Sequence, residues 1–198
     1  MAAFFERTLP SLPDLKVFMR AQRLRPVLVY TDASFSYVRG VPVAWLGLYV
    51  LDPVTGAEFY SRLKLPAEYF RRFAPNKRTY IAQAELIVAI AAYLTLPELL
   101  RGRAVMHFID NTVALSAIVN GYASKADCAA MVNSFHETIL ALRSYLWAEW
   151  VPSAANIGDW PSRPDKVHLV PKSAKFVKMV LPPLSVLDAY VAGEDVEW

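Results

Sequence analysis

Short runs of β-branched and aromatic residues dominate the first third of the chain and predict three consecutive strands. The runs cover 27–34, 41–51 and 57–65, and each has the length and composition typical of a strand. Between the second run and the third lies Asp52-Pro53-Val54-Thr55-Gly56, in which Pro53 presets φ and Gly56 accepts a backbone conformation that other residues avoid. Three strands joined by such short turns indicate an antiparallel meander.

From residue 79 onward the apolar spacing changes to that of helices alternating with strands. Helices are predicted over 79–96, 111–120 and 124–144, and strands over 104–109 and 146–151. Pro97 ends the first helix, Gly121 suits the C-cap of the second, and Pro152 stops the last strand. An antiparallel start followed by alternating strands and helices predicts an α/β fold, with helices packed on a mixed sheet.

Both ends of the chain differ from this central domain, which we place at 27–163. Residues 1–26 carry three prolines and several arginines, so we interpret them as an N-terminal arm or connector. Residues 164–198 combine spaced lysines, the sequence Leu181-Pro182-Pro183 and an acidic end. We interpret them as a C-terminal tail that either wraps the domain or meets a partner, and the sequence leaves both possibilities open.

Composition excludes several classes of protein. Apolar residues make up 55% of the 198 residues, which is too many for a wholly disordered chain. The longest uncharged apolar stretches, 40–51 and 86–97, are well short of the roughly 20 residues that a membrane span needs. Glu6 and Arg7 are charged residues where a signal peptide would have its apolar core. Cys128 is the single cysteine of the sequence and cannot form an internal disulfide. We therefore expect an intracellular protein that is not secreted and has no membrane partner.

The charge is unevenly distributed along the chain, although the net charge is only +3. Residues 1–80 carry 12 Lys/Arg against 6 Asp/Glu, whereas residues 81–198 carry 9 against 12. A basic front half could orient the molecule on a polyanion such as a nucleic acid. The alternative is that these side chains only solvate the surface.

Four carboxylates stand at positions that suggest chemistry. Asp32 ends the first strand, Glu85 lies within the first long helix, Asp110 ends the central strand, and Asp159 follows the last strand. Asp110 or Asp159 alone could simply cap a helix, but Glu85 has apolar neighbours, where an isolated charge is costly. Strand-end carboxylates on adjacent strands can meet a carboxylate from a helix that crosses the sheet.

Such a cluster would repel itself and raise its own pKa values unless divalent cations neutralised it. A donor set made only of oxygen suits Mg²⁺ or Mn²⁺. Two such ions about 3.5–4 Å apart can support in-line displacement at phosphorus.

The segments around these carboxylates resemble, in order, the acidic motifs of the ribonuclease H family. They read YTDAS, AQAELIVAIAA, HFIDNTVALSAIVNGY and VPSAANIGDWPSR, and the resemblance covers about 27–163. It is closest to the ribonuclease H domains fused to the reverse transcriptases of DIRS-like and gypsy-like retrotransposons. The last motif has the form Asn-x-x-Asp-x-x-Ser-Arg, here Asn156, Asp159, Ser162 and Arg163.

This resemblance implies a fold, a reaction and a set of partners. The fold is a five-stranded mixed sheet of order 3-2-1-4-5 with flanking helices. Asp32, Glu85, Asp110 and Asp159 would hold two Mg²⁺ ions, with Mn²⁺ as a substitute, around the scissile phosphate of the RNA strand in an RNA–DNA hybrid. A reverse transcriptase or another tethering protein would contact the arm or the tail.

Contacts with the nucleic acid are expected from basic residues near the carboxylates and from polar residues within the motifs. This set comprises Ser34, Arg39, Arg71, Arg72, Lys77, Arg78, Asn111, Thr112, Asn156 and Arg163. Trp147, Trp150 and Trp160 could stack on bases, but aromatic residues on and after a strand more often belong to the core. The family's histidine before the fourth carboxylate has no counterpart in 151–158, and we interpret His107, His136 and His168 as structural or surface residues.

Two other functions remain compatible with the sequence. A ribonuclease H fold that has lost catalysis could serve as an interaction or scaffold module. A nuclease of the same superfamily could use the same metals on DNA, because fold alone does not fix the substrate.

Overall fold

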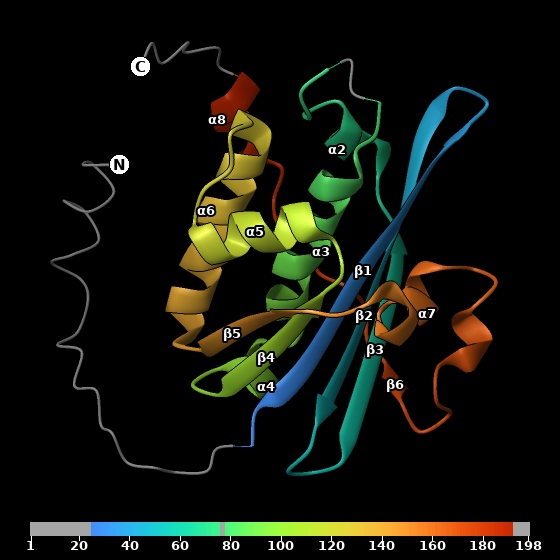
Figure 1. Cartoon of the computed structure of the whole chain (residues 1–198), viewed down its shortest axis with the longest axis vertical. Coiled ribbons are helices and arrows are strands. Elements are labelled where there is room, and N and C mark those ends of the chain that lie inside the picture. Colours follow the sequence, from blue (N-terminus) through green and yellow to red (C-terminus); the bar gives the residue numbers. More distant parts are fainter. Residues whose placement is uncertain (1–24, 76–77, 192–198) are drawn as a thin grey trace, which may run out of the picture.

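A computed structural model describes residues 25–75 and 78–191 of the chain, and its centre is a six-stranded mixed sheet (Figure 1). The strands follow the order β5-β4-β1-β2-β3-β6. Their bounds are β1 (Val27–Val38), β2 (Val41–Asp52), β3 (Ala57–Lys64), β4 (Ala104–Ile109), β5 (Tyr145–Trp150) and β6 (Lys175–Phe176). The predicted order 3-2-1-4-5 is confirmed, and β6 adds a short strand beside β3.

The predicted antiparallel meander forms the first half of this sheet. β2 pairs antiparallel with both β1 and β3, whereas β4 pairs parallel with β1 and β5 pairs parallel with β4. The turn between β2 and β3 is stabilised by the carboxylate of Asp52, which accepts hydrogen bonds from the Val54 amide (3.1 Å) and the Thr55 hydroxyl (3.0 Å). β1 runs four residues beyond the predicted end at Ser34, because it continues as a ribbon with β2.

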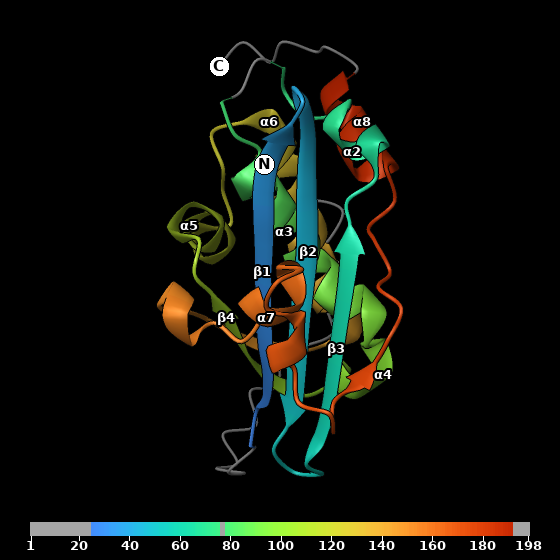
Figure 2. The same ribbon diagram turned by 90° about the vertical axis from the view of Figure 1, so that its right-hand side faces the viewer.

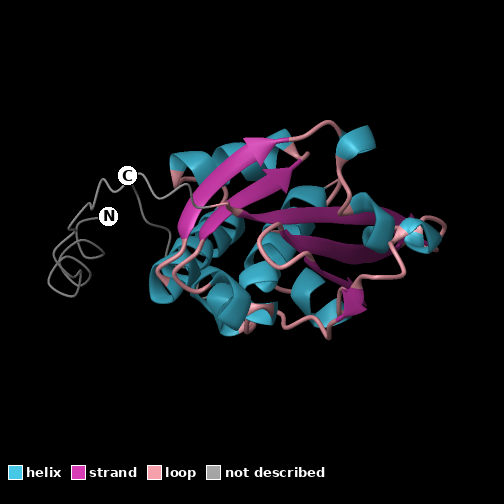
Figure 3. Cartoon of the chain, turned by 90° about the horizontal axis from the view of Figure 1, so that it is seen from below, coloured by secondary structure: helices cyan, strands magenta, loops and turns pink. Residues whose placement is uncertain are grey.

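Helices cover one face of the sheet, as Figure 2 shows with the sheet in front of them. The helices of this face are α3 (Ile81–Thr95), α4 (Pro97–Leu100), α5 (Thr112–Asn120) and α6 (Ala126–Leu142), and α2 (Ala67–Phe70) precedes them. α3 is buried along most of its length between the sheet and α6, so its apolar residues do not form a single stripe. Figure 3 shows the strands and these helices packed beside one another.

The chain beyond residue 163 packs on the domain as far as it is described. After α7 (Asp159–Ser162), the 3₁₀ turn η3 (Val167–Leu169) leads to β6, which pairs with β3, and to α8 (Ser185–Val191), which contacts α6. Leu187 of α8 is fully buried. For residues 164–191 the structure therefore favours the wrapping alternative. The arm at 1–24 and the chain end at 192–198 lie outside the described residues.

The tryptophans of β5 are not in the core, contrary to expectation. Trp147 and Trp150 are 63% and 49% exposed, because β5 is the edge strand of the sheet. Trp160 packs edge-on against the buried Tyr49, with ring centroids 6.4 Å apart.

Cys128 is buried, as predicted. Among the described residues, no helix is both long and apolar enough to cross a membrane.

Candidate active site

Asp32, Glu85 and Asp110 come together at the point where β4 ends beside β1. The last pair in the β1–β4 ladder is Thr31 with Ile109, so Asp32 and Asp110 follow directly on neighbouring parallel strands. Each of the three carboxylates offers one oxygen, and these oxygens lie within 4.8 Å of one another. The predicted meeting of these three side chains, from two strands and one helix, is confirmed.

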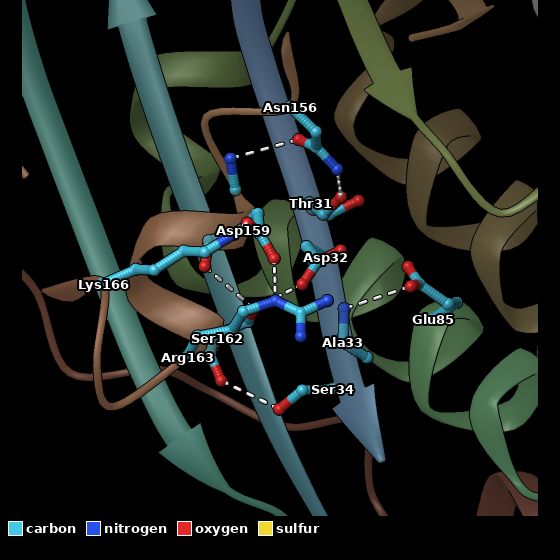
Figure 4. Close-up of polar contacts among 11 residues, drawn as sticks. Thr31, Asp32, Ala33, Ser34, Glu85, Asn156, Asp159, Ser162, Arg163 and Lys166 are labelled. Carbon is cyan, nitrogen blue, oxygen red and sulfur yellow. Dashed lines mark hydrogen bonds and ion pairs between the residues drawn. The ribbon is translucent and has the colours of Figure 1, made fainter. Parts of the chain in front are cut away.

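Glu85 reaches the cluster from α3 and is held against the open edge of β1. Its Oε1 accepts a hydrogen bond of 3.1 Å from the Ala33 amide, which no strand pairs because β4 has ended (Figure 4). Its Oε2 is buried and has no hydrogen-bond partner among residues 25–75 and 78–191. A buried carboxylate oxygen without a partner is costly, so this atom is suited to an external ligand.

Asp110 is not needed as a helix cap. The sequence allows Asp110 to cap the following helix, but Asn111 does so, accepting hydrogen bonds from the amides of Val113 (3.1 Å) and Ala114 (3.0 Å). The Trp150 indole N–H donates to the main-chain carbonyl of Asp110 at 3.2 Å and so fixes the backbone there. The Asp110 carboxylate is therefore left to the cluster.

The last motif lies on the opposite face of the sheet from α3, where α7 crosses β1 and β2 (Figure 2). Two glycines permit this close approach. A Cβ on Gly47, the β2 partner of Asp32, would come within 2.3 Å of the Ser162 amide nitrogen, and one on Gly158 would come within 2.9 Å of the Thr31 backbone. Any larger residue at either position would push α7 away from Asp32.

Asn156 fastens this segment to β1. Its side-chain amide donates to the Thr31 carbonyl at 3.0 Å, and its carbonyl oxygen accepts from the Gly158 amide at 3.0 Å (Figure 4). Because Asn156 is buried and both ends of its amide are engaged, it has a structural role here in place of the expected contact with nucleic acid.

Asp159, the fourth carboxylate, is paired with two cations. It forms ion pairs with Arg163 and Lys166, and it does not belong to the group of three carboxylates that share one centre. It nevertheless lies near enough to Asp32 for its charge to raise the pKa of Asp32. The structure thus brings three of the four predicted ligands together and places the fourth beside them, neutralised.

Burial is the main influence on the charges of the cluster. It raises the pKa of Asp32 to about 6, and the charges of Asp110 and Asp159 add to the rise, whereas the hydrogen bond from Ser162 opposes it. Burial also raises the pKa of Glu85 well above its ordinary value, with further contributions from Asp32 and Asp110. Without a cation the cluster therefore binds protons that ordinary carboxylates would release.

The donor set fits a divalent cation. The carboxylates supply only oxygen, which Mg²⁺ and Mn²⁺ prefer, and the orphaned Oε2 of Glu85 lacks a partner that such an ion would provide. The cluster opens into a cavity of about 350 Å³ with a mainly polar lining, which includes Ser34, Asn111, Ser153 and Arg163. The cavity gives a charged ligand access to the carboxylates.

The other residues expected to contact nucleic acid are dispersed. Ser34, Asn111 and Arg163 line the cavity, and Thr112 is exposed at the start of α5. Arg39 lies at the tip of the β1–β2 hairpin, Arg71 and Arg78 are exposed between α2 and α3, and Arg72 pairs with Asp188 of α8. Lys77 lies outside the described residues.

Two contacts at the site were missed by sequence reasoning. Ser162 was seen only as part of a motif, yet its hydroxyl donates to Asp32, and Lys166 was not singled out although it pairs with Asp159. The Ser162–Asp32 contact joins residues 130 positions apart. The motif spacing contained the signal for Ser162, but only the fold shows which carboxylate it contacts.

Comparisons with known proteins agree with this architecture. No protein-family profile and no curated protein sequence matches the chain. Among solved structures it is similar to LC11-RNase H1, isolated from compost by a metagenomic approach, with a TM-score of 0.52 and 16% identity over 74% of this chain and 99% of that chain.

Two weaker similarities are to the RNase H1 of the halophilic archaeon Halobacterium salinarum NRC-1 and to LC11-RNase H1 in complex with an RNA/DNA hybrid. The first has a TM-score of 0.47 and 17% identity, covering 67% of this chain and 90% of that chain. The second has a TM-score of 0.41 and 14% identity, covering 68% and 92%. The similarity to LC11-RNase H1 and the sheet order together show that this chain has the ribonuclease H fold.

Proposed function

We propose that this protein is a metal-dependent endonuclease of ribonuclease H type, which hydrolyses the RNA strand of RNA–DNA hybrids. The observation that carries the proposal is the cluster of buried Asp32, buried Glu85 and half-buried Asp110, with the unpartnered Glu85 oxygen, at a polar cavity. A purely structural role does not account for three adjacent acids of which two are buried, because their repulsion destabilises the fold.

Asp32, Glu85 and Asp110 would hold one Mg²⁺ ion, and Asp159 would contribute to a second ion after releasing Arg163 and Lys166. Divalent ions at such a site activate a water nucleophile and neutralise developing charge at the scissile phosphate. The Ala33 amide and the Ser162 hydroxyl orient the carboxylates of Glu85 and Asp32. Mn²⁺ is expected to replace Mg²⁺ because it accepts the same oxygen ligands.

Side chains around the cavity would position the substrate without reading its sequence. Arg163 lines the cavity, and its hydrogen bond to Asp159 raises its pKa, to which the charges of Asp159 and Asp32 add, so it stays cationic. A guanidinium at this place suits a phosphate oxygen of the RNA strand. Ser34 and Asn111 supply further polar groups on the same wall.

We further propose that the chain derives from a retroelement and works beside a reverse transcriptase or another tethering protein. The four ordered motifs support this origin, above all the form Asn156-x-x-Asp159-x-x-Ser162-Arg163. The few exposed cations near the cavity support a need for a tether, because phosphate contacts supply most non-specific affinity for nucleic acids.

The decisive experiment compares cleavage of a labelled RNA–DNA hybrid by the wild type, Asp110→Asn and Asp165→Asn in Mg²⁺. Asp165 is exposed, follows α7 and does not belong to the cluster. Asp165→Asn therefore removes the same negative charge as Asp110→Asn, but away from the cluster, and serves as the control. We expect Asp110→Asn to lose cleavage at least about 1,000-fold and Asp165→Asn to keep it. If the wild type is no more active than Asp110→Asn, the proposal that this protein is a nuclease is refuted.

Two further measurements separate the alternatives. Faster cleavage of duplex DNA than of hybrid would favour a DNA nuclease. Calorimetry that detects no Mn²⁺ binding at millimolar concentration would favour a catalytically retired scaffold.

A further inference from the structure

The outer ends of β1 and β2 form a two-stranded ribbon that projects beyond the rest of the sheet, which we call the β1–β2 arm (residues 36–43). β4 pairs with β1 only as far as Thr31, and β3 pairs with β2 only from Trp45 inward, so no third strand supports the arm. Figure 1 shows it extending past β3 at the upper right. Isolated two-stranded ribbons are at best marginally stable in water, so this extension has no evident structural purpose.

The arm is anchored at its base by aromatic packing. Phe35 lies 6.0 Å from Tyr80 and 6.3 Å from Phe70 between ring centroids, and Tyr37 packs edge-on against Phe35 at 5.2 Å. The base is therefore fixed relative to the segment that carries Arg71 and Arg78. Beyond this base, the tip of the arm projects away from the rest of the sheet.

The tip of the arm places a cation where the backbone disfavours it. Arg39 and Gly40 form the two-residue turn, and both have positive φ, of 51° and 78°. Such turns strongly favour Asn or Gly at the first position, because other side chains clash in the left-handed conformation. An arginine here forgoes local stability, and it places a guanidinium at the outermost point of the arm.

Apolar side chains flank this cation and remain in solvent. Val38 and Val41 pair across the ribbon and are 53% and 57% exposed. A cation between exposed apolar residues on a protruding ribbon is typical of a surface that meets a partner.

One side of the β1–β2 arm is continuous with the cavity. Side chains alternate along a strand, so Ser36 and Val38 lie on the same side of β1 as Asp32 and Ser34. On β2 the matching positions are Val43 and Trp45, and the Arg62 guanidinium lies 4.5 Å from the Trp45 ring centre. Hydroxyl and aliphatic groups therefore lead outward from the carboxylate cluster along one ribbon, and the Arg62 guanidinium of β3 lies beside its base.

We propose that the β1–β2 arm binds the sugar–phosphate backbone of the hybrid at a distance from the scissile phosphate, with Arg39 on a phosphate and Val38 and Val41 against sugars. This proposal rests on the proposed function. Arg39 lies seven residues beyond Asp32 along the strand, or about 23 Å at 3.3 Å per residue. A hybrid that runs outward from the cavity along β1 would pass that point, and its phosphates would complement the cation at the tip.

The test uses two arginines in the same backbone conformation. Arg143 also has positive φ, of 52°, and is exposed where α6 ends, just before β5 begins, whereas the metal centre lies where β4 ends. Asn is favoured in this conformation, so Arg39→Asn and Arg143→Asn should both keep or raise the melting temperature. Each variant removes one positive charge, and only Arg39→Asn removes it from the arm.

Steady-state cleavage by each variant is measured on a hybrid of about 16 base pairs. Binding of the same hybrid is measured by fluorescence anisotropy, with each variant combined with Asp110→Asn so that the hybrid is not cleaved. We expect Arg39→Asn to raise KM and Kd about three- to tenfold with kcat unchanged, and to lower the salt dependence of log Kd by about one phosphate contact. Arg143→Asn should match the wild type. Val38→Ser with Val41→Thr should raise KM by a smaller factor.

A modified substrate locates the contact. Uncharged methylphosphonate linkages outside the central six base pairs should abolish the difference between Arg39→Asn and the wild type. If the difference persists on that substrate, or if Arg39→Asn behaves as Arg143→Asn does, the arm is not a backbone grip. If the wild type cleaves the hybrid in either case, the proposed function stands and only the arm proposal falls, whereas a wild type that neither binds nor cleaves hybrid overturns both.

Discussion

Thr31 and Asp32 are neighbours on β1, but each joins a buried polar cluster of a different kind. Thr31 lies on the helix side of the sheet, where its hydroxyl contacts His107 Nε2 at 2.8 Å and the Tyr93 hydroxyl contacts His107 Nδ1 at 3.3 Å. Asp32 joins Glu85 and Asp110 at the end of β4. The three side chains of the histidine cluster are fully buried, whereas Asp110 of the acidic cluster is half-buried. The two clusters also differ in how completely the protein supplies hydrogen-bond partners for them.

The histidine cluster is complete within the protein. Burial lowers the pKa of His107 to about 3, so the ring is neutral and has one donor and one acceptor, and each ring nitrogen has a hydroxyl partner. In the acidic cluster, burial raises the pKa values of Asp32 and Glu85, and one oxygen of Glu85 has no partner. The comparison indicates that the first cluster serves the fold and that the second requires a ligand from outside.

The largest expected effect comes from removing the negative charge of Glu85. Glu85→Gln keeps an acceptor for the Ala33 amide but weakens the cation site, so hybrid cleavage should fall at least about 1,000-fold, equivalent to about 4 kcal/mol. The free energy of unfolding without metal should stay the same or increase, because a buried charge is removed. A variant that loses stability and activity together would show that Glu85 serves the fold.

The second effect is a pH dependence of stability that Asp32 controls. The pKa of Asp32 is raised from 3.8 to about 6 in the folded protein, so the folded state holds a proton that the unfolded state releases between these values. As pH rises from about 4 to 6, ionisation of Asp32 should therefore lower stability without metal by up to about 3 kcal/mol, and Glu85, whose pKa is also raised, should extend the fall to higher pH. Asp32→Asn should remove the share of this fall that Asp32 contributes, as measured by urea denaturation in EDTA at pH 4 and pH 6. An equal pH dependence in both proteins would exclude Asp32 as its source.

The third effect is stabilisation by the metal alone. A Mg²⁺ or Mn²⁺ concentration of 100 times Kd should stabilise the folded state by about 2.7 kcal/mol, which a rise in melting temperature at matched ionic strength would report. Asp110→Asn should show little of this rise. Equal stabilisation of both proteins would mean that the ion binds elsewhere.

The smallest effect is expected in the histidine cluster. Tyr93→Phe leaves His107 Nδ1 buried without its hydroxyl partner, which should reduce the free energy of unfolding by about 1–2 kcal/mol, with kcat changed less than about twofold. Tyr122→Phe, at an exposed tyrosine, provides the matched control. A large loss of kcat in Tyr93→Phe would show that the two clusters are coupled through β1.

Much of the fold could be predicted from local sequence. The helix over 81–95 ends before Pro97 and the strand over 104–109 has its predicted bounds, because periodicity and chain-breaking residues act over a few positions. The prediction of tryptophans in the core failed at β5, because an edge strand and a central strand can have the same composition and only the order of the sheet distinguishes them.

The candidate site divides in the same way. The sequence by itself determined that Asp110 ends a strand and that Glu85 lies on a helix with apolar neighbours, since these are local properties. The prediction that Asp32 ends a strand was wrong, because pairing with β2 carries β1 on to Val38. Only the tertiary structure decided that Ser162 donates to Asp32 and that one oxygen of Glu85 has no partner among the described residues. These facts depend on the close approach of α7 to β2 and of α3 to β1, and such packing across more than 50 residues leaves no periodic trace in the chain.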